Sequence, residues 1–218
     1  MKSILFISFL CLVSYCQGYS QYLGAKDSDP EALKVLTKAS EGFKSKNVRL
    51  NFNLKISYPG KEAEINEGTL YQAGKNYRLE LKDYIIMSNG TTRWVYLKGP
   101  NEVNIYNESS GQDWISPQDF LQLYTSKELV FVLAANRPDG TSVIEAKPLK
   151  GKFESYSKFT IGVKNGMLSY INGLSSDGTR QEMSITNVTN PATWDATKLF
   201  TFQAESFPGV HVEDLRLD

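Results

Sequence analysis

The clearest pattern along the chain is a strict alternation of polar and apolar side chains over residues 49–58. Side chains on a β-strand point alternately to opposite faces of the sheet, so this pattern predicts one long strand with an apolar face and a solvated face. The dipeptide Pro59-Gly60 follows at once and predicts a turn. The apolar positions of the strand are Leu50, Phe52, Leu54, Ile56 and Tyr58.

Residues 84–107 predict three further strands that are joined by two tight turns. The first turn contains Asn89-Gly90, a pair typical of a type I′ hairpin, in which both central residues have positive φ. The second turn covers residues 99–101. On the strand between the turns, Trp94 and Tyr96 are two positions apart, so their side chains share one face. These aromatic side chains either fill a core or line a pocket, and the pattern alone leaves both alternatives open.

Two segments have helical periodicity. An apolar stripe predicts an amphipathic helix over residues 30–46, and Ser28 and Asp29 are suited to cap its N-terminus. A second, short helix is predicted over residues 116–126. Residues 127–135 form an apolar run that fits either a buried strand or a third helical piece, because periodicity does not separate the two. The stripe of the first helix consists of Ala32, Leu33, Val35, Leu36, Ala39 and Phe43.

Turn signals divide the rest of the chain into short strands, and Gly68 in the second of them indicates a bulge or a close approach of another group. About ten or eleven strands, two or three helices and no strand–helix alternation predict a mainly β fold with some α structure. We expect a single curved antiparallel sheet, an unclosed β-barrel with helices in its concavity as a lid, forming one domain over residues 21–218. The further predicted strands cover residues 62–72, 77–81, 143–148, 156–163, 167–173, 180–186 and 199–202.

Residues 1–20 have the features of a signal peptide. Lys2 is followed by an apolar run that is too short to span a membrane. Cleavage after Ser20 removes both cysteines, Cys11 and Cys16, so we expect no disulfide in the mature chain. The chain has 24 basic and 24 acidic residues, and loss of Lys2 leaves 23 basic residues and a net charge near −1. We therefore expect a soluble exported protein with no nucleic-acid partner.

The reactive side chains argue against catalysis. The chain has one histidine, His211, near its C-terminus, and it lacks the Gly-x-Ser-x-Gly motif of serine hydrolases. No histidine and cysteine residues are spaced as metal ligands are. Carboxylates such as Asp113 and Glu128 are scattered and fit solvated loops. We predict that the protein is not an enzyme and has no metal and no cofactor.

Aromatic residues are concentrated in the N-terminal two-thirds of the chain. Each one alone is best explained by packing in a core. As a set they exceed what the thin core of a single sheet needs, and they predict an apolar ligand cavity between the curved sheet and its helices. These residues are Phe52, Tyr58, Tyr71, Tyr77, Trp94, Tyr96, Trp114, Phe120, Tyr124 and Phe131.

Five short motifs follow the first helix in a characteristic order: EGTLY at 67–71, MSNGTTRWVY at 87–96, KFTI at 158–161, KLFTF at 198–202 and PGVHVED at 208–214. In order and spacing they resemble the outer-membrane lipoprotein carrier family, LolA, over nearly the whole mature chain. The final pair of motifs is the most specific part of the resemblance.

The resemblance implies an unclosed antiparallel barrel lidded by helices and a location in the periplasm. Such a carrier accepts a triacylated lipoprotein from an ATP-driven, ABC-type exporter of the inner membrane, shields its acyl chains and hands them to the outer membrane. The implied partners are acylated lipoproteins, the exporter and, where present, an outer-membrane acceptor, and we expect a monomer. The residue after Ser20, a glutamine, and the turn at 73–76 resemble carriers of Bacteroidetes-type bacteria.

In the better-known members of that family, an arginine just after the second strand bonds to the lid and helps to hold it shut. The corresponding turn here reads Ala73-Gly74-Lys75-Asn76, so Lys75 and the nearby Arg78 are the candidates for lid gating. Lysine and arginine are not interchangeable at multidentate sites, and the way in which this lid closes therefore stays open.

The predicted cavity lining combines apolar residues of the first helix, the strands and the lid helix. Two other functions stay open: a periplasmic regulatory module that senses lipids or lipoproteins, and a lipid or glycan hydrolase. The lack of a spare histidine or a carboxylate pair argues against the hydrolase. The predicted lining is Leu33, Leu36, Phe43, Phe52, Leu54, Ile56, Leu70, Leu79, Trp94, Tyr96, Ile105, Phe120 and Leu123.

Overall fold

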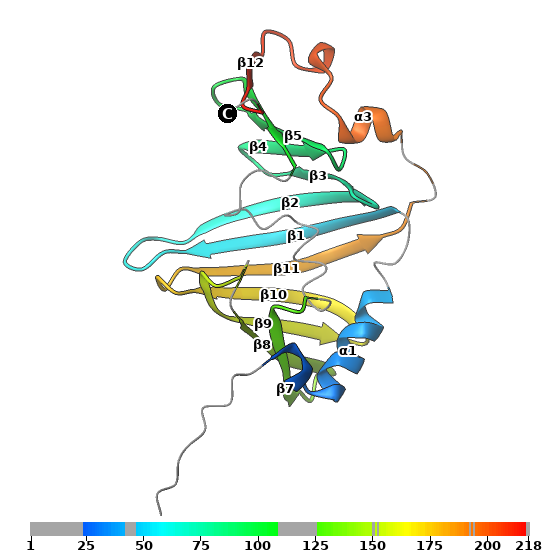
Figure 1. The fold of residues 1–218 in the computed structure, drawn as a ribbon, viewed down its shortest axis with the longest axis vertical. Coiled ribbons are helices and arrows are strands. Elements are labelled where there is room, and N and C mark those ends of the chain that lie inside the picture. Colours follow the sequence, from blue (N-terminus) through cyan, green and yellow to red (C-terminus); the bar gives the residue numbers. More distant parts are fainter. Residues whose placement is uncertain are drawn as a thin grey trace, which may run out of the picture.

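A single twelve-stranded sheet dominates the computed structural model (Figure 1). The structure describes residues 24–41, 47–108, 126–149, 151, 153–191, 193 and 195–216. The strand order is β12-β6-β5-β4-β3-β2-β1-β11-β10-β9-β8-β7. β12 and β7 are thus the two edges, and the sheet stays unclosed. Neighbouring strands are antiparallel except for β12, which runs parallel to β6.

The elements follow the chain as a series of hairpins. The helical elements are η1 (Ala25–Asp27), α1 (Pro30–Ser40), α3 (Ala196–Phe200) and η4 (Ala204–Ser206). The strands of the first half are β1 (Asn47–Ser57), β2 (Glu64–Ala73), β3 (Asn76–Glu80), β4 (Tyr84–Ser88), β5 (Thr92–Leu97) and β6 (Glu102–Asn107). The remaining strands are β7 (Leu129–Asn136), β8 (Thr141–Pro148), β9 (Tyr156–Lys164), β10 (Met167–Ser175), β11 (Arg180–Thr189) and β12 (His211–Asp214).

The predicted mainly β, unclosed architecture is confirmed. The run at 127–135, which periodicity left ambiguous, contains most of strand β7. The strand predicted at 199–202 is wrong, because helix α3 extends to Phe200 and residues 201–202 belong to no strand. The carboxylate of Asp195 caps that helix by accepting a hydrogen bond from the backbone N–H of Lys198 at 3.3 Å. The helix predicted at 116–126 lies outside the described residues.

The start of α1 also protects an edge of the sheet. Asp29 is its N-cap, as the sequence suggested, and accepts a hydrogen bond from the N–H of Glu31 at 2.9 Å. On edge strand β7, the N–H of Phe131 donates to Ser28 Oγ at 3.1 Å, and the N–H of Leu133 donates to Asp29 Oδ2 at 3.2 Å. These bonds occupy edge donors that would otherwise be open to another strand.

Two Asn-Gly turns that look alike in sequence differ in conformation. Asn165 and Gly166 both have positive φ, 53° and 77°, as a type I′ turn requires. At Asn89-Gly90 only Gly90 has positive φ, 84°, so the type I′ turn predicted there is wrong. The side chain of Asn89 instead accepts hydrogen bonds from the N–H groups of the two residues that follow Gly90, at 3.0 and 2.9 Å.

Candidate functional site

Helix α1 identifies the two faces of the sheet. It packs against β7, β9 and β10, as Figure 1 shows, and we call the face that it covers the inner face. Ala32, Leu36 and Ala39 of α1 are buried there in one apolar cluster with strand residues. The buried strand members of this cluster are Leu129, Phe131, Ile144, Ala146, Phe159, Ile161, Val163 and Ile171.

The inner face continues from this cluster across the whole sheet. Ile171 of β10 lies opposite Met183 of β11, which in turn lies opposite Leu54 of β1. Side chains of directly opposed residues share a face, so β1 and its neighbours present their apolar side chains on the same side as α1. A second buried cluster follows there, formed by Leu50, Phe52, Leu70, Tyr77, Leu79, Leu81 and Ile86.

Five aliphatic residues of this second region form an unbroken line across five adjacent strands. Each lies opposite the next in the strand register. With neighbouring strands about 4.8 Å apart, the line spans about 19 Å. We call it the inner apolar row: Leu50, Leu70, Leu79, Ile86 and Val95.

Phe52 extends the floor beside this row. It lies opposite Gly68, and a Cβ atom at Gly68 would be only 2.3 Å from Phe52 Cζ. The close approach that Gly68 indicated in the sequence is therefore confirmed, since no larger residue leaves room for this ring.

Three residues of the predicted lining lie on the opposite, outer face. Trp94 and Tyr96 share a face, as predicted, but they alternate with Val95, which belongs to the inner apolar row. Ile105 lies opposite Trp94 and has the same orientation. The prediction that these three side chains line the same cavity as Leu79 is therefore wrong. The Tyr96 ring instead contacts the C-terminal segment.

The C-terminal segment covers this part of the outer face. The Phe207 ring lies 4.5 Å from the Tyr96 ring and 5.1 Å from the Phe202 ring, measured between centroids. The side chain of Phe200, in α3, is fully buried. Helices therefore do not all lie in the concavity, because α3 packs on the outer face near β3 and β4 (Figure 1).

Of the two gating candidates, Arg78 lies on the outer face because it alternates with buried Tyr77 and Leu79. Its Nε donates to Glu80 Oε1 at 2.6 Å, and one terminal nitrogen donates to the carbonyl of Leu199 in α3 at 3.5 Å. Arg78 thus contacts helix α3 on the outer face, and its gating role stays a prediction. These residues line a pocket of about 520 Å³ on the outer face.

Lys75, the other candidate, lies in the exposed turn between β2 and β3, and its gating role stays a prediction. Among the other predicted lining residues, Leu33 on α1 is 36% exposed, whereas Leu36 is buried in the first cluster. Phe43, Phe120 and Leu123 lie outside the described residues. The remaining strand residues of the lining, which face the inner side, are Phe52, Leu54, Ile56, Leu70 and Leu79.

A polar cluster borders the inner apolar row and was missed by the sequence analysis. The carboxylate of Glu108 accepts hydrogen bonds from Tyr77 Oη at 3.2 Å and from Ser88 Oγ at 2.6 Å. The guanidinium of Arg93, which is buried, lies 5.2 Å from the centroid of the Tyr106 ring. The available signal was the two-residue spacing of Arg93 from Val95, which places both on one face.

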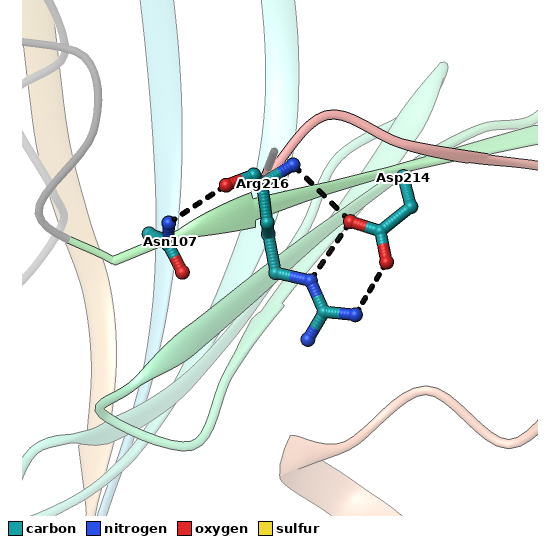
Figure 2. Close-up of polar contacts among 3 residues, drawn as sticks. All are labelled: Asn107, Asp214 and Arg216. Carbon is teal, nitrogen blue, oxygen red and sulfur yellow. Dashed lines mark hydrogen bonds and ion pairs between the residues drawn. The ribbon is translucent and has the colours of Figure 1, made fainter. Parts of the chain in front are cut away.

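The last strand, β12, pairs with β6 and holds the C-terminal segment against the sheet. Figure 2 shows that the side chain of Asp214 accepts two hydrogen bonds from the Arg216 guanidinium, of which the one from Nε is 2.8 Å long. Asn107 Nδ2 donates to the carbonyl of Arg216 at 3.3 Å. Hydrogen bonding to Arg216 lowers the pKa of the Asp214 carboxyl to about 2. The exposed acidic end therefore has a structural partner that the sequence did not indicate.

The described part of the chain has neither a metal-ligand cluster nor a membrane-spanning helix. In those residues, no group of three His, Cys, Asp or Glu side chains is placed to hold a metal ion. No helix within the same ranges has the length and hydropathy needed to cross a bilayer. The feature that distinguishes this structure is the apolar inner face.

No family model and no curated protein sequence matches this chain. An uncharacterized conserved protein from Thermus thermophilus is similar in structure, with a TM-score of 0.55 and 10% identity over 84% of this chain and 99% of its own. A DUF1329 family protein from Desulfovibrio piger has a TM-score of 0.50 and 14% identity over 81% and 98% of the two chains. These two likenesses show the fold.

A LolA superfamily protein from Nitrosomonas europaea is also among the similar solved structures, with a TM-score of 0.43 and 14% identity over 78% of this chain and 97% of its own. The narrower assignment to carriers of Bacteroidetes-type bacteria stays a prediction.

Proposed function

We propose that this protein binds the acyl chains of lipoproteins on its inner face and carries them between two membranes. In this proposal it is a periplasmic carrier, exported by the signal peptide predicted at residues 1–20. It receives lipoproteins from an ABC-type exporter of the inner membrane and delivers them to the outer membrane. It acts by binding alone and is not an enzyme.

The inner apolar row is the observation that carries this proposal. The hydrocarbon core of a bilayer is about 30 Å thick, so the acyl chains of one leaflet occupy about 15 Å of that depth. The row, at about 19 Å, is long enough to lie along one such chain. A chain of about 16 carbons loses on the order of 12 kcal/mol on exposure to water, at ~0.8 kcal/mol per methylene, so its carrier needs an unbroken apolar surface. The sequence motifs that resemble LolA support the same function.

Release of the cargo has a physical basis in the burial of the row. The exposed fractions of Leu50, Leu70 and Leu79 are 1%, 3% and 6%. An acyl chain therefore reaches the row only when the groups that cover it in the ligand-free protein move aside. The free energy of that opening is subtracted from the free energy of binding, which keeps the cargo releasable.

The test compares two neighbouring isoleucines of β4 that point to opposite faces. Ile86 belongs to the inner apolar row, and Ile85 lies opposite Tyr96 on the outer face. The measurement is the fluorescence of an acylated lipopeptide with a polarity-sensitive dye on its chain. We expect the wild-type protein to protect the dye from water at micromolar concentration. Ile86→Thr should weaken binding about 5- to 30-fold, because a buried unpaired hydroxyl costs about 1–2 kcal/mol.

Ile85→Thr is the matched control and should change the affinity less than about twofold, because this side chain does not face the row. Circular dichroism of both variants checks that they fold. Absence of dye protection by the wild-type protein rejects the carrier function, and equal losses in the two variants reject the inner face as the site. Hydrolysis of the lipopeptide would indicate an enzyme, and co-purification with an anti-sigma factor would favour the regulatory module.

A further inference from the structure

The inner apolar row ends at a polar side chain with an unusual environment. Asn104 of β6 lies opposite Val95, the last member of the row, and it shares the inner face with it. Among the residues that the structure describes, Asn104 Oδ1 is the one buried side-chain oxygen or nitrogen atom without a hydrogen-bond partner. Buried polar atoms are nearly always paired, because leaving one unpaired forfeits its hydration without return. An unpaired acceptor at the end of an apolar surface therefore points to a donor supplied by a ligand.

The charges around Asn104 restrict what that donor is. Glu213 of β12 lies opposite Asn104, and Glu102 lies two residues before it on β6, so both carboxylates are on the inner face. The guanidinium of Arg93, near them on this face, lies against the Tyr106 ring, so the two carboxylates and the unpaired Oδ1 acceptor together favour a group that carries N–H. A free fatty acid has only a carboxylate at its polar end, and an ester-linked chain has no N–H at its linkage. An amide-linked chain presents one N–H at its linkage, separated from its first methylene by the carbonyl carbon alone.

The length of the row sets where that linkage lies. An acyl chain that follows the row from Val95 toward Leu50 has its apolar tail over aliphatic side chains for about 19 Å. Its polar end then lies over β6, the next strand, where Asn104 is the residue in register. The inner apolar row and the unpaired oxygen of Asn104 thus form one elongated site, with the row along its length and the oxygen at its end.

We propose that Asn104 Oδ1 accepts a hydrogen bond from the amide N–H at the head of a bound acyl chain, so that the site selects amide-linked chains over ester-linked chains and free fatty acids. This assignment rests on the proposed function, because it names the chemistry recognised at one end of the same acyl site. It adds a specificity-determining residue on a strand that contributes no aliphatic side chain to the row.

The experiment measures two matched ligands by calorimetry. One is a tripeptide with an N-terminal palmitoyl amide, and the other is its analogue in which an ester oxygen replaces the amide N–H. We expect the wild-type protein to bind the amide about three- to tenfold more tightly, the range of one buried hydrogen bond. In Asn104→Leu, which keeps a similar shape without the acceptor, the ratio of the two affinities should fall to about one.

Asn53→Leu is the control, because Asn53 is exposed and alternates with inner-face Phe52 and Leu54 on β1. Its affinity ratio should equal that of the wild-type protein. If both ligands bind and Asn104→Leu keeps the wild-type ratio, Asn104 does not recognise the amide and the proposal is overturned, while the carrier function stands. If neither ligand binds the wild-type protein, the proposed function itself fails. Preferential binding of palmitate over the amide also overturns the selectivity.

Discussion

Substitution of Gly68 by alanine tests the floor of the proposed acyl site. With ideal backbone geometry, an added Cβ lies 2.3 Å from Phe52 Cζ and 2.8 Å from each of the two Cε atoms, distances at which the ring has to move. Phe52 is only 5% exposed and belongs to the second inner cluster, so the ring cannot swing freely into solvent. The substitution should therefore strain the core and also push the ring toward the space of the proposed guest.

The expected magnitude follows from the size of the clash. Extra methyl or methylene groups in a packed core cost about 1–3 kcal/mol, and for a chain of this length each kcal/mol lowers the melting temperature by about 2–4 °C. Gly68→Ala should thus lower it by about 2–12 °C. Where the backbone conformation suits alanine, the same exchange stabilises a protein by about 0.4–1 kcal/mol, because alanine reduces the conformational entropy of the unfolded chain.

Thermal unfolding followed by circular dichroism makes the comparison, with Gly99→Ala as control. No atom lies within 4 Å of a Cβ at Gly99, so that variant should melt at or slightly above the wild-type temperature. The double variant Gly68→Ala/Phe52→Leu should lose less stability than the two single changes combined, because leucine relieves the clash. A Gly68→Ala protein as stable as the wild type would refute the close packing of this ring.

Two further predictions concern the ends of the sheet. Asp29→Ala removes the cap of α1 and a hydrogen-bond acceptor for edge strand β7. It should lower the free energy of unfolding, measured by urea titration, by about 1–2 kcal/mol. The control Glu31→Ala, at an exposed site, should change this free energy by less than about 0.5 kcal/mol. The carboxyl of Asp214 has a pKa of about 2 in the folded state and 3.8 without its partner, so its contact with Arg216 stabilises β12 above pH 4 and is lost as the pH falls toward 2. A carboxyl carbon NMR titration of Asp214 should have its midpoint near 2 and should return toward 3.8 in Arg216→Gln; a wild-type midpoint at 3.8 would show that the contact does not form.

The sequence predicted most strands correctly, because a strand that buries one face alternates apolar and polar residues. In β1 the polar side chains of Arg49, Asn53 and Lys55 are exposed, and the apolar side chains that alternate with them therefore identify the inner face. In β5 the same period placed Trp94 and Tyr96 together correctly, yet it did not reveal which face they occupy. Both faces of β5 carry apolar side chains, and alternation then says which residues share a face but not what covers it.

The outer cover of β5 comes from a segment about a hundred residues away. Phe207 packs on Tyr96 only because the C-terminal chain returns along β6 as β12, which is a long-range contact that local periodicity does not encode. Helix α3 was mistaken for a strand for a related reason. Its apolar residues are too few for a helical period, and the cap at Asp195 decides the local structure.

The unpaired oxygen of Asn104 was likewise invisible in the sequence. An asparagine on an alternating strand is ordinarily solvated. Asn104 becomes a candidate binding residue only because the strand register places it at the end of a row of five aliphatic side chains. Register between strands depends on turn geometry and bulges along the whole sheet, which single-sequence patterns do not specify.

Intermolecular NOEs between a bound acyl chain and methyl-labelled protein test the central claim most directly, because they report contacts within a few ångströms. With an N-palmitoyl peptide bound, the methylene protons should show NOEs to the methyl groups of Leu70, Leu79 and Ile86 on the inner face. The methyl groups of Ile85 and Ile105, on the outer face, should show none. NOEs confined to the outer-face isoleucines, or a saturated complex without NOEs to the inner apolar row, would contradict the account.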